Sequence, residues 1–341
     1  MKVFVHFQPN KGFDDFEGAR LRKTIKSALE TLNIPHTDTR MDDFDVAHFI
    51  YLEDESVIQE LKERNIPIVV SALYCEDDPS ASYIDYKDKD GERIYTFSPK
   101  VIKFLNNVDL ILVPNSFAKQ MLINAGIKVR TEICPPGVNF ARFDFSRDDE
   151  KELFYRYFNC EKGKKIVLTV GDSSSGLDGM SVISKAATIC KDVNFYYFNK
   201  NKHNNKINSK NRKTIKKLPK NVIVKNRIPD DIYRSALINA DVYLKPGYKP
   251  AGMITICEAL AAKCQLITRD QDILKDIALD QETAYVASYS ETLSSIIKDY
   301  FEGKIKPTID NGYKLVSKNT VKTFGDTIVG YYQELIDNKR R

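Results

Sequence analysis

The stretch KIVLTVGDSSSGLDGMSVISKAATIC, residues 165–190, contains the unit from which the whole fold is built. Its apolar run Ile166–Val170 predicts a buried strand. A loop of small residues, Gly171–Gly179, follows it, and residues 179–190 carry apolar side chains at helical spacing. A strand, a glycine-rich turn and a helix in this order are typical of a parallel α/β sheet.

The same alternation continues on both sides of this stretch. Ahead of it the sequence predicts strands at 3–7, 45–50, 66–70 and 109–113, and helices at 21–32, 55–64, 99–106 and 116–125. After it the sequence predicts strands at 195–198, 222–224, 242–244 and 265–268, and helices at 229–237, 253–262, 290–301 and 319–338. Short apolar strands that alternate with helices predict an α/β fold with two doubly wound sheets.

A chain of 341 residues is about twice the usual length of one domain. Pro135-Pro136-Gly137 and the charged run at 147–152 mark a boundary. We therefore expect an N-terminal domain at 1–147, completed by the C-terminal helix 319–341, and a C-terminal domain at 148–318. Ligands of such sheets bind outside the carboxyl ends of the strands. The expected site is the cleft between the domains, formed by loops 8–20, 71–78, 114–117, 171–179 and 245–253.

The composition excludes several classes of protein. Hydrophobic residues make up 42% of the chain and charged residues 29%, as in an ordinary globular protein. No apolar run approaches the length of a membrane span, and the N-terminus MKVFVHFQPN is too short and polar for a signal-peptide core. We therefore expect a cytoplasmic protein. Its six cysteines form no CxxC pair and its four histidines lie far apart, so we predict reduced thiols, no metal and no cofactor.

The positive charge is concentrated in one segment. Residues 199–220 hold nine Lys or Arg and no acidic residue, whereas the whole chain has a net charge of only +5. Such a segment could attach the protein to an anionic membrane surface. It lacks the interleaved aromatic residues that stack on bases, so we predict no nucleic-acid role. The alternative is a solvated loop in a chain rich in Lys and Asn.

Two loops of the second half could bind a nucleotide. Gly171–Gly179 places backbone N–H groups before a helix, where a phosphate can lie, although it matches neither GxGxxG nor a P-loop. The alternative is a tight strand–helix turn. Lys245–Met253 leads into a helix with Glu258, whose carboxylate could accept hydrogen bonds from a ribose or sugar hydroxyl. The alternative is a solvated surface carboxylate.

The order of these features resembles the GT-B glycosyltransferases, in particular the retaining family-four enzymes. The matching residues are Gly18, Pro136-Gly137-Val138-Asn139, Val170-Gly171 and Glu258-Ala259-Leu260-Ala261. Within this family the layout is similar to bacterial enzymes that extend glucosyl-diacylglycerol. That narrower similarity rests on Glu17-Gly18-Ala19-Arg20, Phe44-Asp45-Val46-Ala47-His48 and Arg269-Asp270.

The resemblance implies two Rossmann-like domains that face each other across a cleft. It also implies transfer of a hexose, with retention, from a nucleotide-sugar such as a UDP-hexose to a lipid-linked or other glycan acceptor. The implied donor-binding residues are Gly171, Asp172, Ser173, Ser174, Arg227, Lys245, Gly252, Met253, Ile254 and Glu258. The implied acceptor-side residues are Gly18, Arg20 and Tyr74. No residue is assigned as catalytic, and His48 is interpreted as a core or strand-end histidine rather than a catalytic base.

The sequence departs from the family pattern at several positions. The family's Arg and Lys-Gly in the first donor loop fall on Asp172 and Asp178-Gly179, and its first paired glutamate falls on Pro250. No histidine occurs in Ser71–Tyr74, where the family has one. Two functions therefore stay open. One is an active hexosyltransferase that uses the backbone N–H groups of Gly171–Ser175 and Lys245, Lys249 or Arg227. The alternative is a non-catalytic GT-B protein that acts as partner or subunit of an active glycosyltransferase.

Overall fold

The chain divides into two compact units, each with its own sheet. The computed structural model describes residues 1–7, 16–75, 78, 82–85, 94–143, 148–171, 179–199, 217–226, 228–248 and 252–340. The first unit comprises residues 1–137, 251–254 and 319–341, and the second comprises 138–250 and 255–318. Each contains a six-stranded parallel sheet.

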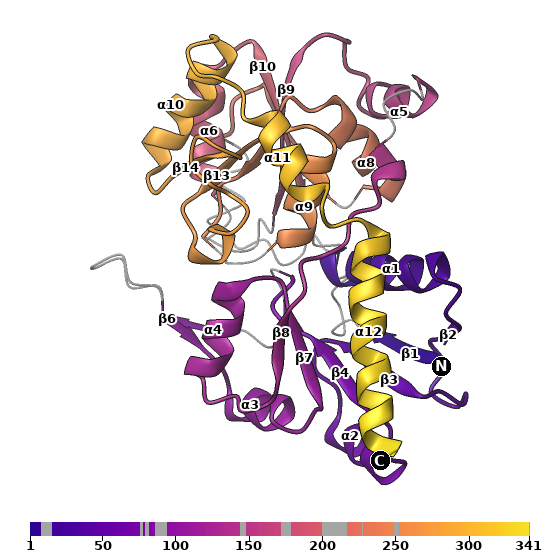
Figure 1. Cartoon of the computed structure of the whole chain (residues 1–341). Coiled ribbons are helices and arrows are strands. Elements are labelled where there is room, and N and C mark those ends of the chain that lie inside the picture. Colours follow the sequence, from indigo (N-terminus) through magenta and orange to yellow (C-terminus); the bar gives the residue numbers. More distant parts are fainter. Residues whose placement is uncertain are drawn as a thin grey trace. The chain divides into compact units, whose positions relative to one another are not determined.

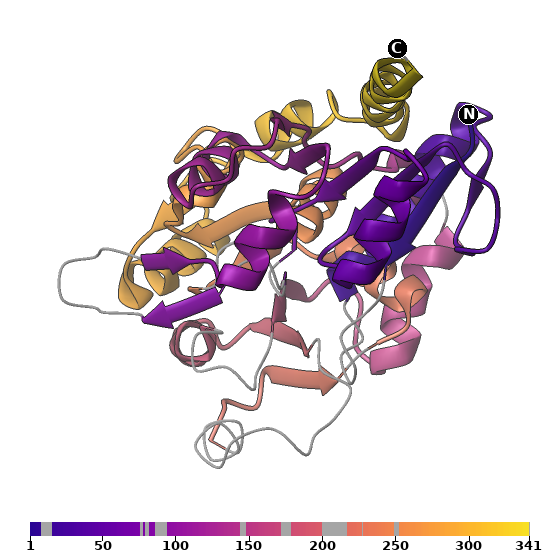
Figure 2. The same cartoon turned by 90° about the horizontal axis from the view of Figure 1, so that it is seen from below.

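The sheet of the first unit has the strand order β2-β1-β3-β4-β7-β8 (Figure 1). Its strands are β1 (Val3–Phe7), β2 (His36–Thr37), β3 (Val46–Ile50), β4 (Ile68–Ser71), β7 (Leu110–Val113) and β8 (Thr131–Ile133). Its helices are α1 (Phe16–Thr31), α2 (Glu55–Glu63), α3 (Pro99–Leu105), α4 (Ser116–Asn124) and α12 (Val321–Arg340). A separate antiparallel ribbon is formed by β5 (Ser82–Asp85) and β6 (Ile94–Thr96), which are the paired arrows at the left of Figure 2.

Helices α1 and α12 cover one face of this sheet together. Ile25 and Leu29 of α1 and Ile328 and Tyr332 of α12 join Val5 of β1 in one buried cluster. Burial of a large aliphatic or aromatic side chain contributes about 1.5–3 kcal/mol to the free energy of unfolding. The 20-residue helix α12 therefore stabilises the N-terminal sheet. The C-terminal helix is thus part of the first unit.

The sheet of the second unit has the order β11-β10-β9-β12-β13-β14. Its strands are β9 (Lys165–Gly171), β10 (Val193–Asn199), β11 (Val222–Asn226), β12 (Val242–Lys245), β13 (Gln265–Arg269) and β14 (Tyr285–Ala287). The helices are α5 (Asp148–Phe158), α6 (Met180–Ile189), α8 (Asp230–Asn239), α9 (Met253–Ala261), α10 (Ser290–Phe301) and α11 (Ile309–Val316), with the 3-10 turns η1 (Phe140–Phe143) and η3 (Asp272–Leu274). The first two residues of α9, Met253 and Ile254, are grouped with the first unit. On one face α6 and α10 pack against β9, β10 and β12 through Ile183, Leu293 and Val167.

The predicted α/β class with two doubly wound sheets is confirmed, and every strand and helix predicted from the alternation is present within a few residues. The charged run at 147–152, interpreted together with Pro135-Pro136-Gly137 as a boundary, leads into α5, a helix that the sequence pattern did not predict. The short strand β14 and helix α11 were also not predicted. In the part of the chain that the structure describes, no helix is both long and apolar enough to cross a membrane.

Candidate functional site

Each sheet has one topological switch point, at which the connections from two neighbouring strands lead to opposite sides of the sheet. In the second unit this point lies between β9 and β12, because β10 and β11 extend the sheet on one side of β9 and β12 to β14 on the other. Gly171 ends β9 and Lys245 ends β12. Ligands of open α/β sheets bind in the crevice outside the strand ends at such a point. The strand ends Gly171 and Lys245, from which the two predicted donor loops start, therefore lie at the crevice position of the second sheet.

Gly179 and Pro246 bring these two loops into contact. A Cβ atom added to Gly179 would lie 2.5 Å from the carbonyl carbon of Pro246 and 2.6 Å from its oxygen. Gly179 also has φ = 77°, in the left-handed region that side chains rarely adopt. It immediately precedes α6, so its lack of a side chain lets the loop after β12 approach the N-terminus of this helix.

Three side chains from β13 and the residues after it hold the loop that follows β12. Thr268 Oγ1 donates to the carbonyl oxygen of Lys245 (3.2 Å), Arg269 Nε to that of Pro246 (2.9 Å), and Gln271 Nε2 to that of Gly247 (2.7 Å). The guanidinium carbon of Arg269 lies 3.8 Å from the centre of the Tyr248 ring. Lys245 itself is buried, with 2% of its surface exposed. The backbone from Lys245 to Tyr248 is therefore fixed in shape next to the crevice.

Glu258 lies in α9 and is almost completely buried. Its Oε1 atom is 3.7 Å from Nη1 of Arg142 in η1, and Nη2 of the same arginine donates to Oδ2 of Asp230 at 2.8 Å. The predicted neighbours Met253 and Ile254 form the first turn of α9 and are buried, and Gly252 before them has φ = 95°. Glu258 is thus a buried carboxylate beside an arginine, and the alternative of a solvated helix carboxylate is wrong.

In the first unit the corresponding point lies between β1 and β3, and Gly18 occupies it. A Cβ atom at Gly18 would lie 2.5 Å from Cε2 of Phe7, which ends β1, and 3.0 Å from the hydroxyl of Tyr51, which follows β3. The charged neighbours Glu17 and Arg20 in the first turns of α1 are both buried. Gly18 therefore allows α1 to begin directly against the carboxyl ends of these two strands.

Two bulky residues at the same edge of this sheet have left-handed backbone conformations. Tyr51 has φ = 76° and Leu73, just after β4, has φ = 65°. The amide of Leu73 donates to Oδ2 of the buried Asp78 at 2.5 Å, which holds this turn in place. Strained backbone of this kind costs about 1–3 kcal/mol per residue and occurs preferentially at functional sites.

Tyr74 and His48 belong to the core of the first unit. The Tyr74 hydroxyl donates to the carbonyl oxygen of Cys134, and burial raises the pKa of Tyr74 well above its usual value. His48 lies between the Tyr332 hydroxyl (2.5 Å from Nδ1) and Ser71 Oγ (2.8 Å from Nε2), as expected of a core histidine. An acceptor contact of Tyr74 stays a prediction, because the described contacts of its hydroxyl lie within the core.

Comparisons with known proteins agree with this architecture. No family model matches the chain. The chain is 24% identical over 348 aligned positions, covering 100% of both sequences, to a processive diacylglycerol alpha-glucosyltransferase from Acholeplasma laidlawii. A glycosyltransferase structure from Rickettsia africae superposes with a TM-score of 0.71 at 14% identity, covering 99% of this chain and 98% of that one. The Anabaena protein HepE in complex with UDP-glucose gives a TM-score of 0.72 at 13% identity, covering 98% and 100%. The fold is GT-B.

Several residues predicted for this GT-B fold lie outside the described part of the chain. They are Asp172, Ser173, Ser174 and Arg227, together with the departures Asp178 and Pro250 and most of the basic segment 199–220. Of the predicted donor residues the structure describes Gly171, Lys245, Gly252, Met253, Ile254 and Glu258, all at or after the ends of β9 and β12.

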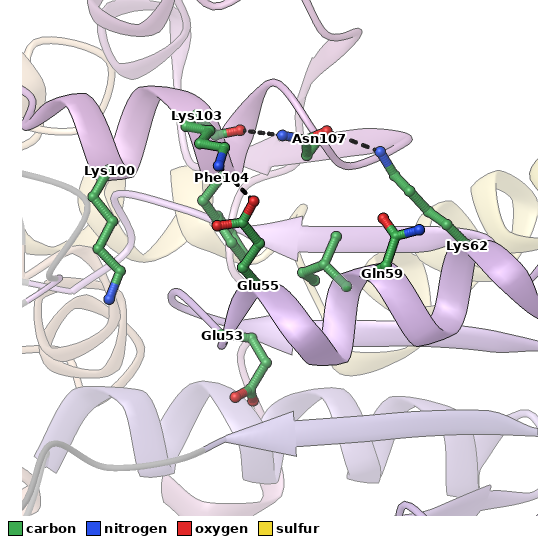
Figure 3. A pocket seen from close by; sticks show the side chains of 9 residues that line it. Glu53, Glu55, Gln59, Lys62, Lys100, Lys103, Phe104 and Asn107 are labelled. Atoms are coloured by element: carbon green, nitrogen blue, oxygen red, sulfur yellow. Dashed lines mark hydrogen bonds and ion pairs between the residues drawn. The ribbon is translucent and has the colours of Figure 1, made fainter.

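Two hollows elsewhere were not predicted from the sequence. A cavity of about 70 Å³ lies between α2 and α3 and is lined by Glu53, Glu55, Ile58, Gln59, Lys62, Lys100, Lys103, Phe104 and Asn107 (Figure 3). Within its lining Lys103 pairs with Glu55 at 2.5 Å and Lys62 donates to Asn107 Oδ1 at 3.0 Å. Ligand pockets usually measure about 300–1,000 Å³. An open hollow of about 450 Å³ beside β14 includes Asp270, Lys275 and Ser288.

Arg142 and Arg269 were missed as site residues. Arg269 directly follows the predicted strand 265–268, so its place at the carboxyl edge of the sheet was available from the sequence. Arg142 follows the Pro-Pro-Gly stop and gave no local signal, because its partners Asp230 and Glu258 are distant along the chain.

Proposed function

We propose that this chain is a glycosyltransferase with a nucleotide-sugar donor. The observation that carries the proposal is the end-to-end similarity to a diacylglycerol alpha-glucosyltransferase, in a chain with the GT-B fold. We propose further that the donor is a UDP-hexose, that transfer occurs with retention, and that the acceptor is a glycolipid or another lipid-linked glycan. The GT-B structure with UDP-glucose supports a donor of this class.

The second unit would bind the donor. Backbone N–H groups at the start of α6, next to Gly179, would face the diphosphate, because the N-terminus of a helix favours an anion. Lys245, buried at the end of β12, would supply a positive charge to the leaving diphosphate. Glu258 would accept hydrogen bonds from donor hydroxyl groups, and a charged acceptor makes the stronger kind of hydrogen bond.

The first unit would bind the acceptor at the strand ends beside Gly18, with Arg20 in the same turns of α1. The relative named above acts on diacylglycerol, which is a membrane lipid. We therefore propose that the protein associates with a membrane surface to reach its acceptor. The basic segment 199–220 would provide the attraction to anionic lipid.

Transfer assays on the full-length protein test the proposal. The protein is incubated with radiolabelled UDP-glucose, UDP-galactose or GDP-mannose and with diacylglycerol or glucosyl-diacylglycerol in mixed micelles. We expect labelled glycolipid from a UDP-hexose, with an α-anomeric proton signal by NMR. A β-linked product would overturn retention. Donor binding in calorimetry without any transfer would favour the non-catalytic partner instead, and no binding of any donor would overturn the whole proposal.

A matched pair of variants tests the site itself. E258Q removes the charge of the proposed hydroxyl acceptor, and E150Q removes the charge of another buried glutamate of the second unit, which pairs with Arg234 at 3.1 Å. Loss of a hydrogen bond to a charged group costs about 1.5–3 kcal/mol, so E258Q should lower kcat/KM about 10- to 100-fold. E150Q should keep the activity of the unaltered protein. Equal losses in both variants would remove Glu258 from the site.

A further inference from the structure

We infer that Arg142 is a positioning residue for the donor, which holds the Glu258 carboxylate in place for a ribose hydroxyl. The inference rests on the proposed function and adds a residue to it. Arg142 lies in η1, Asp230 begins α8, and Glu258 lies in α9, so the arginine joins three separate elements of the second unit.

The geometry distinguishes the two carboxylates. Nη2 of Arg142 donates to Oδ2 of Asp230 at 2.8 Å, a full hydrogen bond. Nη1 lies 3.7 Å from Oε1 of Glu258, which is an ion-pair distance but too long for a hydrogen bond. Asp230 therefore anchors the guanidinium. Arg142 attracts the Glu258 carboxylate without donating a hydrogen bond to Oε1.

Burial makes this attraction important. The Glu258 side chain is 10% exposed and that of Arg142 is 23% exposed. A carboxylate removed from water needs a nearby countercharge to stay ionised and in place. The planar guanidinium can face two carboxylates at once, whereas a lysine ammonium on its flexible chain cannot hold both in the same geometry. Arg142 thus holds the Glu258 carboxylate in the orientation of a hydroxyl acceptor.

The second unit contains a matched pair that lacks this arrangement. Arg234 of α8 has a side chain 22% exposed and lies 3.1 Å from Glu150, whose side chain is 8% exposed. This arginine–glutamate pair is about as buried as Arg142–Glu258. It joins α8 to α5, however, and neither of its residues is a predicted donor residue. R234M is therefore the control for the loss of a half-buried arginine.

The test measures how well the protein distinguishes UDP from 2′-deoxy-UDP. Dissociation constants for both nucleotides are measured by calorimetry on the full chain and on R142M, R142K, R234M and E258Q. We expect R142M to weaken the binding of UDP about tenfold and that of 2′-deoxy-UDP less than twofold. The ratio of the two dissociation constants should therefore fall toward that of E258Q. R142K should lose part of the preference for UDP over 2′-deoxy-UDP, and R234M should keep all of it.

The outcomes separate this inference from the proposed function. If the unaltered protein binds no uridine nucleotide, both fail. If it prefers UDP and R142M keeps that preference, Arg142 has no positioning role and only this inference is overturned. Should R142M not fold, as judged by its melting temperature, R142K decides: a preference equal to that of the unaltered protein overturns the inference, and a reduced one supports it. Equal loss in R142M and R234M also overturns it.

Discussion

The Nδ1 atom of His48 lies 2.5 Å from the hydroxyl oxygen of Tyr332, so a histidine in the first parallel sheet is joined to the C-terminal helix. The same ring reaches Ser71 Oγ on β4 through Nε2. His48 has no exposed surface, and this burial lowers its pKa from 6.5 to about 3. The neutral ring therefore connects β3, β4 and α12 in the core of the first unit.

This burial predicts a loss of stability in mild acid. Below pH 6.5 the unfolded chain binds a proton at His48, while the folded protein does not until about pH 3. The free energy of unfolding should therefore fall by about 1.4 kcal/mol per pH unit from this residue alone. Urea unfolding at pH 7.5 and pH 5 checks it. In H48N, which cannot titrate, the decrease between these pH values should be smaller; an identical decrease would contradict the assignment.

Arg269 should be essential to the loop after β12. Its guanidinium donates to Pro246, Ser288 and Ser290, and it stacks on the Tyr248 ring. R269M removes these donors from a fully buried position, which should cost about 2–5 kcal/mol of unfolding free energy and raise the dissociation constant for UDP. Y248A removes only the ring and should cost about 1–2 kcal/mol. Equal stability of R269M and the unaltered protein would show that the loop is held by other contacts.

Gly179 should be irreplaceable because of a contact as well as its conformation. G179A adds a Cβ 2.5 Å from the carbonyl carbon of Pro246, at φ = 77°. Gly163 has nearly the same backbone angle, φ = 79°, but a Cβ there meets nothing within 4 Å. G163A should therefore cost about 1 kcal/mol, from the left-handed conformation alone. G179A should cost clearly more and weaken nucleotide binding, as measured by thermal unfolding and calorimetry. Equal costs would mean that the approach to Pro246 is easily relaxed.

The strands and the strand-end glycines of this protein could be predicted from the sequence, because both are local properties. The run Leu110–Val113 is apolar throughout and lies within the predicted strand 109–113. Helix α5 was missed because its charged start resembles a linker. Its position depends instead on Phe154 and Phe158, whose rings each lie 4.9 Å from that of Tyr196 on β10. Packing between distant segments, rather than local composition, fixes this helix.

In the candidate site, too, the local features could be predicted from the sequence and the contacts between distant segments could not. Gly18 and Gly171 lie between a predicted strand and a predicted helix, and Gly179 begins the predicted helix 179–190, so their place at the sheet edge follows from the alternation. Tyr74 also follows a strand, yet its ring turns into the core and its hydroxyl bonds to Cys134. The pairing of Arg142 with Glu258 depends on how η1 and α9 pack together, and no spacing in the sequence reports it.

We expect the basic segment 199–220 to bind anionic membranes because its nine Lys and Arg residues are concentrated in one stretch of the sequence. Each lysine near an anionic surface contributes about 1 kcal/mol, so replacing Lys202, Lys206, Lys210 and Lys213 by Gln should lower binding to phosphatidylglycerol vesicles by about a thousandfold. Co-sedimentation at low and high salt measures this, since the attraction is screened by salt. A control variant replaces Lys162, Lys164, Lys185 and Lys304, all at least half exposed in the second unit, and has the same net charge. It should bind nearly as well as the unaltered protein. Equal losses in the two variants, or equal binding to neutral vesicles, would show that the segment has no specific membrane role.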